Sequence, residues 1–351
     1  MTLLSDGDFT RCPWLANANG SPFQVVSSRI RLARNLEGHP FSHWAGPRDL
    51  SAVAAAVREA VARCSMLSDC EIIPVDKLDE ADRLFLAERQ LISRELAAGG
   101  AERLVIVRRD QRLSLMVNEE DHLRIQCLSP GLALRETWRE VNDLDDQLEH
   151  YLPYAFHPRW GYLTACPTNT GTGIRCSVML HLPALVMIKK VNRLLSAVQK
   201  LGMTVRGTGG EGTEITGNLF QISNQQTLGV SEVQEVEQLE ELVKRLIDWE
   251  EEALGQLQKE ARSLIEDKIW RAYGILQHAR TISSLESNEL LSALRLGVRL
   301  GIVTNVSVEA LNQVMICSGP GHLQKIAGTH LEPAQRDAMR AEFIRERIPL
   351  N

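Results

Sequence analysis

The sequence predicts an α+β fold, with a domain of strands and helices over residues 1–252 and an all-α C-terminal domain over residues 253–351. Two observations lead to this prediction. In the first domain, runs that alternate apolar and polar residues, as strands do, are interspersed with runs of helical period. Beyond residue 252 the alternation disappears, and short helical units rich in Arg, Glu and Leu continue to the C-terminal segment.

The strand pattern is clearest over 103–109 and 112–118, which only Asp110 and Gln111 separate, so these segments predict a hairpin. Shorter strands are expected over 203–206 and 218–224. Helical repeats are expected over 50–64, 79–97, 129–151, 183–201 and 332–348, and from a Ser-x-x-Gln capping box at Ser231 for roughly nine turns to Leu264.

The segment 25–35 places Arg29 and Arg31 two residues apart. Both guanidinium groups therefore lie on one face if the segment is extended. By itself this segment favours a surface strand at a sheet edge, with both arginines solvated.

Composition limits the class of protein. With 351 residues, 44% of them hydrophobic and 24% charged, the chain is long enough for two domains. A net charge of -6 argues against bulk binding to nucleic acid but allows a local basic pocket. Seven cysteines without a CxxC pair indicate neither a disulfide framework nor a zinc site, and favour the reduced cytoplasm. The sequence also lacks a secretory signal and a run of apolar residues long enough to span a membrane.

The stretch from Cys166 to Pro183 combines a thiol, a turn rich in threonine and glycine, and Arg175. Gly171 and Gly173 allow the backbone to approach a ligand closely, and the threonine hydroxyls can donate hydrogen bonds to an anion. An ordinary turn before a buried strand explains the same residues. This stretch therefore indicates an anion site only together with other motifs.

Two further loops carry carboxylates. Glu119, Glu120 and Asp121 follow a predicted strand directly, and adjacent carboxylates repel unless a cation lies between them; an acidic solvated turn is the alternative. The glycine-rich loop with Glu211 and Glu214 also follows a strand. It is neither a phosphate-binding Walker A loop nor a dinucleotide fingerprint, because no GK[ST] follows it and its glycine spacing differs.

The charges in these motifs suit phosphoryl transfer to a guanidinium group. Convergent arginines would bind a triphosphate, and Mg²⁺ would be held by the phosphates and water without a cluster of protein ligands. Carboxylates would bind a cationic acceptor in bidentate fashion and accept its proton, and a Cys166 thiolate would act as an electrostatic partner. The candidate arginines are Arg29, Arg31, Arg124, Arg175 and Arg206, and the candidate carboxylates are Glu119, Glu120, Glu211 and Glu214.

Four motifs resemble the phosphagen (guanidino) kinase family in their order and residues: SSRIRLAR at 27–34, NEEDHLR at 118–124, CPTNTGTGIRCSV at 166–178 and RGTGGEGTE at 206–214. The resemblance implies a mostly antiparallel sheet flanked by helices. It also implies that Arg29, Arg31, Arg124, Arg175 and Arg206 hold the phosphates of ATP, that Glu120 and Glu211 bind the guanidinium, and that Cys166 is the active-site cysteine.

Within this family, NEEDHLRIQCL, CPTNTGTGIR, HLPAL and GNLFQISNQQTLG are similar to the bacterial branch that phosphorylates arginine in proteins. Members that act on free guanidino compounds carry a helical domain of roughly a hundred residues before the SSR motif, whereas Ser27 lies near the start of this sequence. We expect this difference to open the acceptor side to a polypeptide. The helical C-terminal domain also matches this branch.

The C-terminal Arg336-Asp337-x-x-Arg340-Ala341 matches the branch's RDxxRA signature, which is associated with phosphoarginine binding and regulation; an ordinary helix ion pair is the alternative. The branch usually has tyrosine where Gly209 stands, so the sequence of this loop does not indicate how it recognises a substrate.

The resemblance implies an enzyme that uses ATP and Mg²⁺ to mark proteins with accessible arginines for stress-response regulation or degradation. It further implies a cytoplasmic dimer or higher oligomer, with a small activator protein, a transcriptional repressor and a Clp-type protease as partners, and no nucleic-acid or membrane partner. Two alternatives remain at this point: a kinase of free arginine or another small guanidino compound, and a weakly catalytic phosphoarginine-binding regulator.

Overall fold

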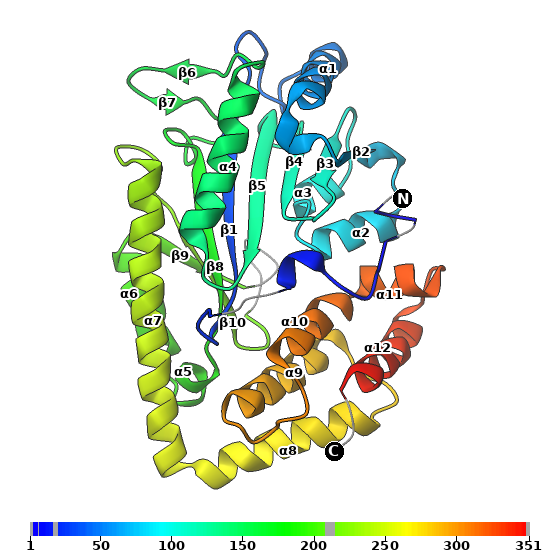
Figure 1. Cartoon of the computed structure of the whole chain (residues 1–351), viewed down its shortest axis with the longest axis vertical. Helices are drawn as coiled ribbons and strands as arrows, with labels where there is room; N and C mark the ends of the chain where they lie inside the picture. Colours follow the sequence, from blue (N-terminus) through cyan, green and yellow to red (C-terminus); the bar gives the residue numbers. More distant parts are fainter. Residues whose placement is uncertain (1–2, 6, 17–19, 208–214, 349–351) are drawn as a thin grey trace.

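A computed structural model describes residues 3–5, 7–16, 20–207 and 215–348. Within these ranges eight strands form one antiparallel sheet in the order β2-β3-β4-β5-β1-β8-β10-β9 (Figure 1). A separate hairpin, β6-β7, lies beside one end of the sheet. The strands are β1 Val25–Arg34, β2 Cys70–Pro74, β3 Leu104–Arg108, β4 Leu113–Val117, β5 Leu123–Pro130, β6 Phe156–His157, β7 Gly161–Tyr162, β8 Ile174–His181, β9 Met203–Arg206 and β10 Leu219–Asn224.

The strand that carries Arg29 and Arg31 lies inside the sheet. β1 pairs with β5 on one side and with β8 on the other along most of its length. The expectation of an edge strand with solvated arginines was therefore wrong. Two-residue alternation cannot distinguish an edge strand from an inner one, because pairing partners come from distant parts of the chain. The predicted hairpin β3-β4 and the strands β9 and β10 are confirmed.

Helices cover both faces of the sheet. α1 (Pro47–Arg63), α4 (Leu134–Glu149) and α7 (Glu232–Glu260) contribute to the main core against one face. On the other face, α2 (Glu80–Glu88) and α3 (Arg94–Ala97) enclose a smaller core over the β2-β3-β4 end. The rest of that second face carries polar side chains and forms the candidate site.

Two helices that the periodicity predicts as continuous are divided, and a third, expected from Ser231 to Leu264, ends already at Glu260. The repeat over 79–97 becomes α2 and α3, because Gln90 adopts a left-handed conformation with φ of 58° and Ser93 caps a new helix. The repeat over 183–201 becomes α5 (Pro183–Met187) and α6 (Val191–Lys200), with Lys189 at φ 58° between them. Neither break contains glycine or proline, the usual sequence signals for a helix end.

The C-terminal region is helical, as expected. α7 begins at the predicted capping box, where Ser231 and Gln234 bond each other's backbone, and runs without a break across residue 252. The following helices pack against one another and against the sheet domain, with α11 lying along α2 (Figure 1). They are α8 Arg262–His278, α9 Ser284–Arg299, α10 Val308–Cys317, α11 Pro320–Ala327 and α12 Pro333–Arg347.

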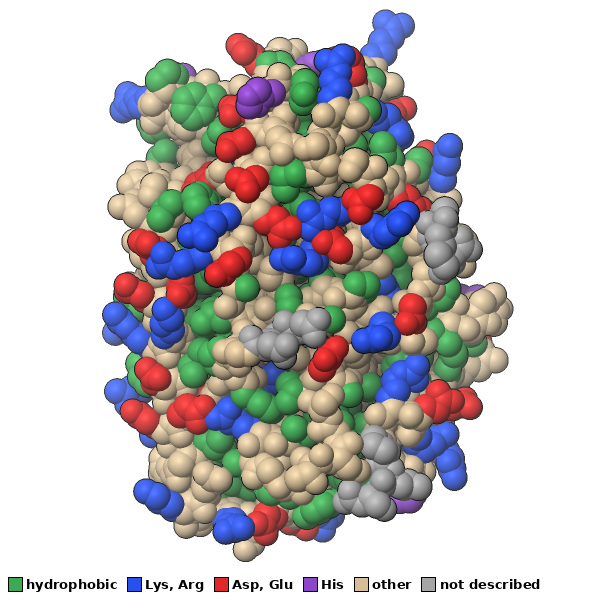
Figure 2. Space-filling view, in the orientation of Figure 1, with side chains coloured by type: hydrophobic (Ala, Val, Ile, Leu, Met, Phe, Trp, Pro, Cys, Tyr) green, Lys and Arg blue, Asp and Glu red, His purple; other side chains and the backbone are tan. Residues whose placement is uncertain are grey.

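The face shown in Figure 2 carries acidic and basic side chains interspersed with one another. No helix among the described residues is both long and apolar enough to cross a membrane.

Candidate active site

One face of the sheet brings together arginines from four strands. In the β1-β8 pair Arg31 lies opposite Arg175, and in the β1-β5 pair Ala33 lies opposite Arg124. Because side chains alternate between faces, Arg29, Arg31, Arg124 and Arg175 all project from the same face. Arg206, at the end of β9, lies opposite Gln221 of β10 on that face. The structure thus gathers the five predicted arginines.

The arginines raise each other's electrostatic energy. Burial, and then the nearby charges of Arg124, Arg175 and Arg206, lower the pKa of Arg29 to about 10. Burial and the charges of Arg29, Arg124 and Arg175 likewise lower the pKa of Arg31 well below its ordinary value. The Nε atoms of Arg29 and Arg31 are buried and have no hydrogen-bond partner within the described part of the chain. A cluster of buried, mutually repelling cations with unused donors is suited to a polyanion.

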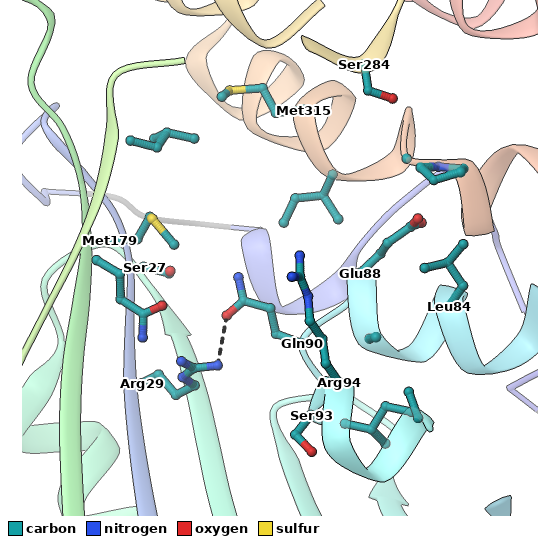
Figure 3. A pocket seen from close by; sticks show the side chains of 18 of the residues that line it. Ser27, Arg29, Leu84, Glu88, Gln90, Ser93, Arg94, Met179, Ser284 and Met315 are labelled. Carbon is teal, nitrogen blue, oxygen red and sulfur yellow. Dashed lines mark hydrogen bonds between the residues drawn. The ribbon is translucent and has the colours of Figure 1, made fainter. Parts of the chain in front are cut away.

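A cavity of about 1210 Å³ opens over this face, between the sheet and the C-terminal helices (Figure 3). Its walls include Arg29, Arg31, Arg124 and Arg206. Beside the arginines, the cavity has a less charged region whose residues were not predicted from the sequence. The strand period could have identified Ser27 and Met179, because they lie an even number of residues from Arg29 and Arg175 respectively. This region is lined by Val26, Ser27, Met179, Leu219 and Gln221.

The two glutamates of the acidic turn have different surroundings. Glu119 is buried, and its Oε1 accepts hydrogen bonds from Ser93 Oγ at 2.5 Å and from Arg124 Nη1 at 2.7 Å. Glu120 is more exposed, and its Oε2 accepts from Arg124 Nη2 at 3.1 Å. Burial raises the pKa of Glu120, as do the neighbouring carboxylates, although Arg124 opposes the shift. Glu120 is thus the more accessible of the two carboxylates.

The rest of this turn holds the loop of Cys166 in place. Asp121 Oδ1 accepts from Asn35 Nδ2 and from Ala165 N, each at 2.7 Å. His122 Nδ1 accepts from Leu36 N at 3.0 Å, and burial lowers the pKa of this histidine. The hydrogen bond between Asp121 and Ala165 therefore joins the residue after Glu120 to the residue before Cys166.

Cys166 is half-buried, and its Sγ lies 3.0 Å from Thr168 Oγ1. The turn that follows is fixed by Thr227, whose Oγ1 donates to the carbonyls of Thr168 and Thr170. Gly171 has φ of 120°, and a Cβ there would lie 2.1 Å from the carbonyl oxygen of Thr227. Only glycine fits this close approach.

A buried ion-pair network lies beneath the site and was not predicted. Arg34 Nε and Nη2 donate to Asp145 of α4 at 2.9 and 2.6 Å, and Nη2 also meets Glu232 of α7 at 3.3 Å. Arg34 Nη1 donates to Thr172 O at 2.9 Å, and its guanidinium stacks 3.6 Å from the ring centroid of Tyr162. This residue therefore ties β1 and two helices to the turn after Cys166.

In the C-terminal domain, Arg340 and Asp337 form an ion pair at 2.5 Å. Arg340 is buried and also donates to Ser318 O at 3.0 Å and to Ile282 O at 2.8 Å, and it lines the same cavity. Arg336 is half-buried on the preceding turn.

Glu211, Glu214 and Gly209 lie outside the described residues. Among the residues that are described, no cluster of three or more His, Cys, Asp or Glu side chains could hold a metal ion.

Comparison with known proteins agrees with this geometry. Residues 52–253 match the family model of the ATP:guanido phosphotransferase C-terminal catalytic domain, and residues 262–350 match that of the protein-arginine kinase McsB C-terminal domain. The chain is 48% identical over 338 residues to the protein-arginine kinase of Desulforamulus reducens, with 95% of each chain covered. It is 45% identical over 336 residues to that of Moorella thermoacetica, with 95% of this chain and 96% of the relative covered.

Solved structures show the same fold. The duplicated taurocyamine kinase from Schistosoma mansoni, with bound components of a transition-state analogue, matches 73% of this chain and 39% of its own, at 25% identity and a TM-score of 0.60. Lombricine kinase matches 70% of this chain and 71% of its own, at 26% identity and a TM-score of 0.58. From its catalytic and C-terminal domains and its near full-length relatives, the chain belongs to the protein-arginine kinases of the ATP:guanido phosphotransferase, or phosphagen kinase, family.

Proposed function

We propose that this chain is an ATP-dependent kinase that phosphorylates arginine side chains of proteins. The observation that carries the proposal is the face of the sheet on which Arg29, Arg31, Arg124 and Arg175 gather beside Glu119 and Glu120. A polyanionic donor and a cationic acceptor each find groups of opposite charge there. The names of the protein-arginine kinases to which the chain is similar support the polypeptide as acceptor.

The five arginines would hold the ATP phosphates, because a polyanion would offset the repulsion among Arg29, Arg31, Arg124, Arg175 and Arg206. The less charged region of the cavity would hold the base, with Met179 and Leu219 as apolar contacts and Gln221 as a hydrogen-bonding amide. Mg²⁺ would be carried by the phosphates and water, and it would neutralise charge that develops on the phosphate oxygens.

At the acceptor end, Glu120 and Glu211 would bind the guanidinium of the substrate. An acceptor nitrogen forms a bond to the γ-phosphorus as the bond from that phosphorus to the β,γ-bridging oxygen breaks, and ADP leaves. The proton lost from the nitrogen passes to a carboxylate, for which the raised pKa of Glu120 is suited. Cys166 would act as an electrostatic partner of the guanidinium, while Glu119 and Glu214 would support substrate binding, Glu119 by orienting Arg124.

The C-terminal residues Arg336, Asp337 and Arg340 would form a phosphoarginine-binding regulatory site. The proposal extends to a cytoplasmic dimer or higher oligomer acting in stress-response regulation or protein degradation. Its partners would be a small activator protein, a transcriptional repressor and a Clp-type protease.

The test is incubation of the protein with ATP, Mg²⁺ and an unfolded arginine-rich protein. Acid-labile phosphate should form on arginine and be absent with Glu120→Ala, whereas Glu136→Ala on the exposed surface of α4 should retain activity. ADP release with free arginine and not with protein would instead identify a small-guanidino kinase. Tight phosphoarginine binding without ATP turnover would identify a regulator.

A further inference from the structure

The end of helix α2 joins the C-terminal domain to the arginine cluster through three consecutive residues. Glu88 is the last residue of the helix, Arg89 follows it, and Gln90 has a left-handed backbone with φ of 58°. That conformation costs a residue other than glycine roughly 1 kcal/mol or more, so the surrounding structure must hold it in place.

Glu88 and Arg89 fix this point in space from several directions. Glu88 accepts from Gly321 N at 2.7 Å and from His322 N at 2.9 Å, at the start of α11 in the C-terminal domain. Buried Arg89 donates from Nε to His322 Nε2 at 3.1 Å and from Nη1 to Gln111 Oε1 at 2.6 Å. Its Nη2 donates to two carbonyl oxygens of the N-terminal segment. The end of α2 is thus held by both domains.

Gln90 extends from this fixed point into the cavity (Figure 3). Its Oε1 accepts a hydrogen bond from Arg29 Nη1 at 3.4 Å, and its backbone oxygen accepts one from Gln126 Nε2 on β5. Among the residues that the structure describes, Nε of Arg29 has no hydrogen-bond partner, and the charged groups that shift the pKa of Arg29 are other arginines. The amide of Gln90 is therefore the acceptor that orients this guanidinium.

We propose that Gln90 is a positioning residue that holds Arg29 ready for a phosphate of ATP. An uncharged amide suits this role, because it orients the guanidinium without neutralising the charge that the phosphate must meet. A carboxylate at this position would pair with Arg29 and compete with the nucleotide. This inference rests on the proposed binding of ATP phosphates by Arg29.

The test measures KM for ATP, kcat and thermal stability for Gln90→Gly and Gln90→Glu. Gln90→Gly removes the amide and relieves the left-handed backbone, so Tm should not fall while KM for ATP rises about fivefold and kcat stays within about twofold. Gln90→Glu should raise KM at least about tenfold, because the pair with Arg29 must break before ATP binds. The matched control is Glu102→Gly, which relieves a similar φ of 56° away from the cavity and should leave KM unchanged.

Arg29→Ala separates this inference from the proposed function. If Arg29→Ala raises KM for ATP strongly while both Gln90 variants stay within twofold of the wild type, Gln90 has no positioning role and the proposed function stands. If Arg29→Ala leaves KM for ATP unchanged, the phosphates do not bind at Arg29, and both the proposed phosphate site and the role of Gln90 are wrong.

Discussion

Replacing Arg34 by methionine should destabilise the protein more than the loss of any exposed ion pair that the structure describes. The side chain of Arg34 is 1% exposed, and that of its nearer partner Asp145 is 7% exposed. Methionine keeps most of the length of the side chain but leaves the buried carboxylate of Asp145 and the half-buried carboxylate of Glu232 without their cation. It also removes the donor to Thr172 O and the stacking on Tyr162.

The expected loss follows from these contacts. Removing one partner of a buried ion pair costs about 3 to 5 kcal/mol, because the remaining charge is left uncompensated. The loss should be smaller at pH 5.5 than at pH 8. Burial already raises the pKa of Glu232, and Arg34 opposes that shift, so without Arg34 this carboxyl is more readily neutralised by a proton.

Equilibrium urea denaturation at both pH values measures the change in unfolding free energy. Arg63→Met is the control, because Arg63 and Glu59 form an exposed pair at 2.5 Å, and its loss should stay below about 1 kcal/mol. Adding Asp145→Leu to Arg34→Met should recover part of the stability, since it removes one uncompensated charge. A loss for Arg34→Met no larger than that for Arg63→Met would refute this account of the buried network.

Three further outcomes are expected. Cys166→Ser should lower kcat at least about tenfold with little change in KM for ATP, measured by steady-state kinetics, because the thiol would act at the acceptor; equal effects on both would contradict its placement. Arg175→Ala should instead weaken ATP binding, alone or together with turnover, in a nucleotide titration; unchanged affinity would place the phosphates elsewhere. Burial raises the pKa of Glu235 from 4.5 to about 7, so protonated Glu235 stabilises the fold below pH 4.5, and that contribution is lost as the pH rises through 7. Glu235→Gln should therefore stabilise the protein by about 1 to 3 kcal/mol at pH 8 and change little at pH 4, and a gain of equal size at both pH values would exclude titration as the cause.

The sequence predicted β3, β4, β9 and β10 because their signals are local, but it did not predict β2 or β5. Arg29 and Arg31 share a face by alternation alone, and Ser231 and Gln234 mark a helix start by their own chemistry. The burial of Arg29 could not be predicted in this way, because it depends on β5 and β8 pairing on either side of β1.

Other parts of the site depend on contacts between residues far apart in the sequence. Nothing near Gln90 indicates a left-handed residue inside a helical repeat, because Glu88 and Arg89 are held by α11, more than 200 positions away. Arg34 likewise resembles an ordinary strand residue until α4 and α7 place carboxylates beside it.

The main core determines whether the catalytic domain can fold without the C-terminal helices. It includes Leu32 and Ile125 from the sheet together with Leu291 and Ile344 from the C-terminal helices, so one apolar interior spans both domains. A chain truncated after residue 252 would expose that interior to water and would end within α7. Cooperative melting of the whole chain in a single calorimetric transition is therefore expected, and proteolytic removal of the C-terminal helices should yield an aggregating fragment in place of an independent catalytic module.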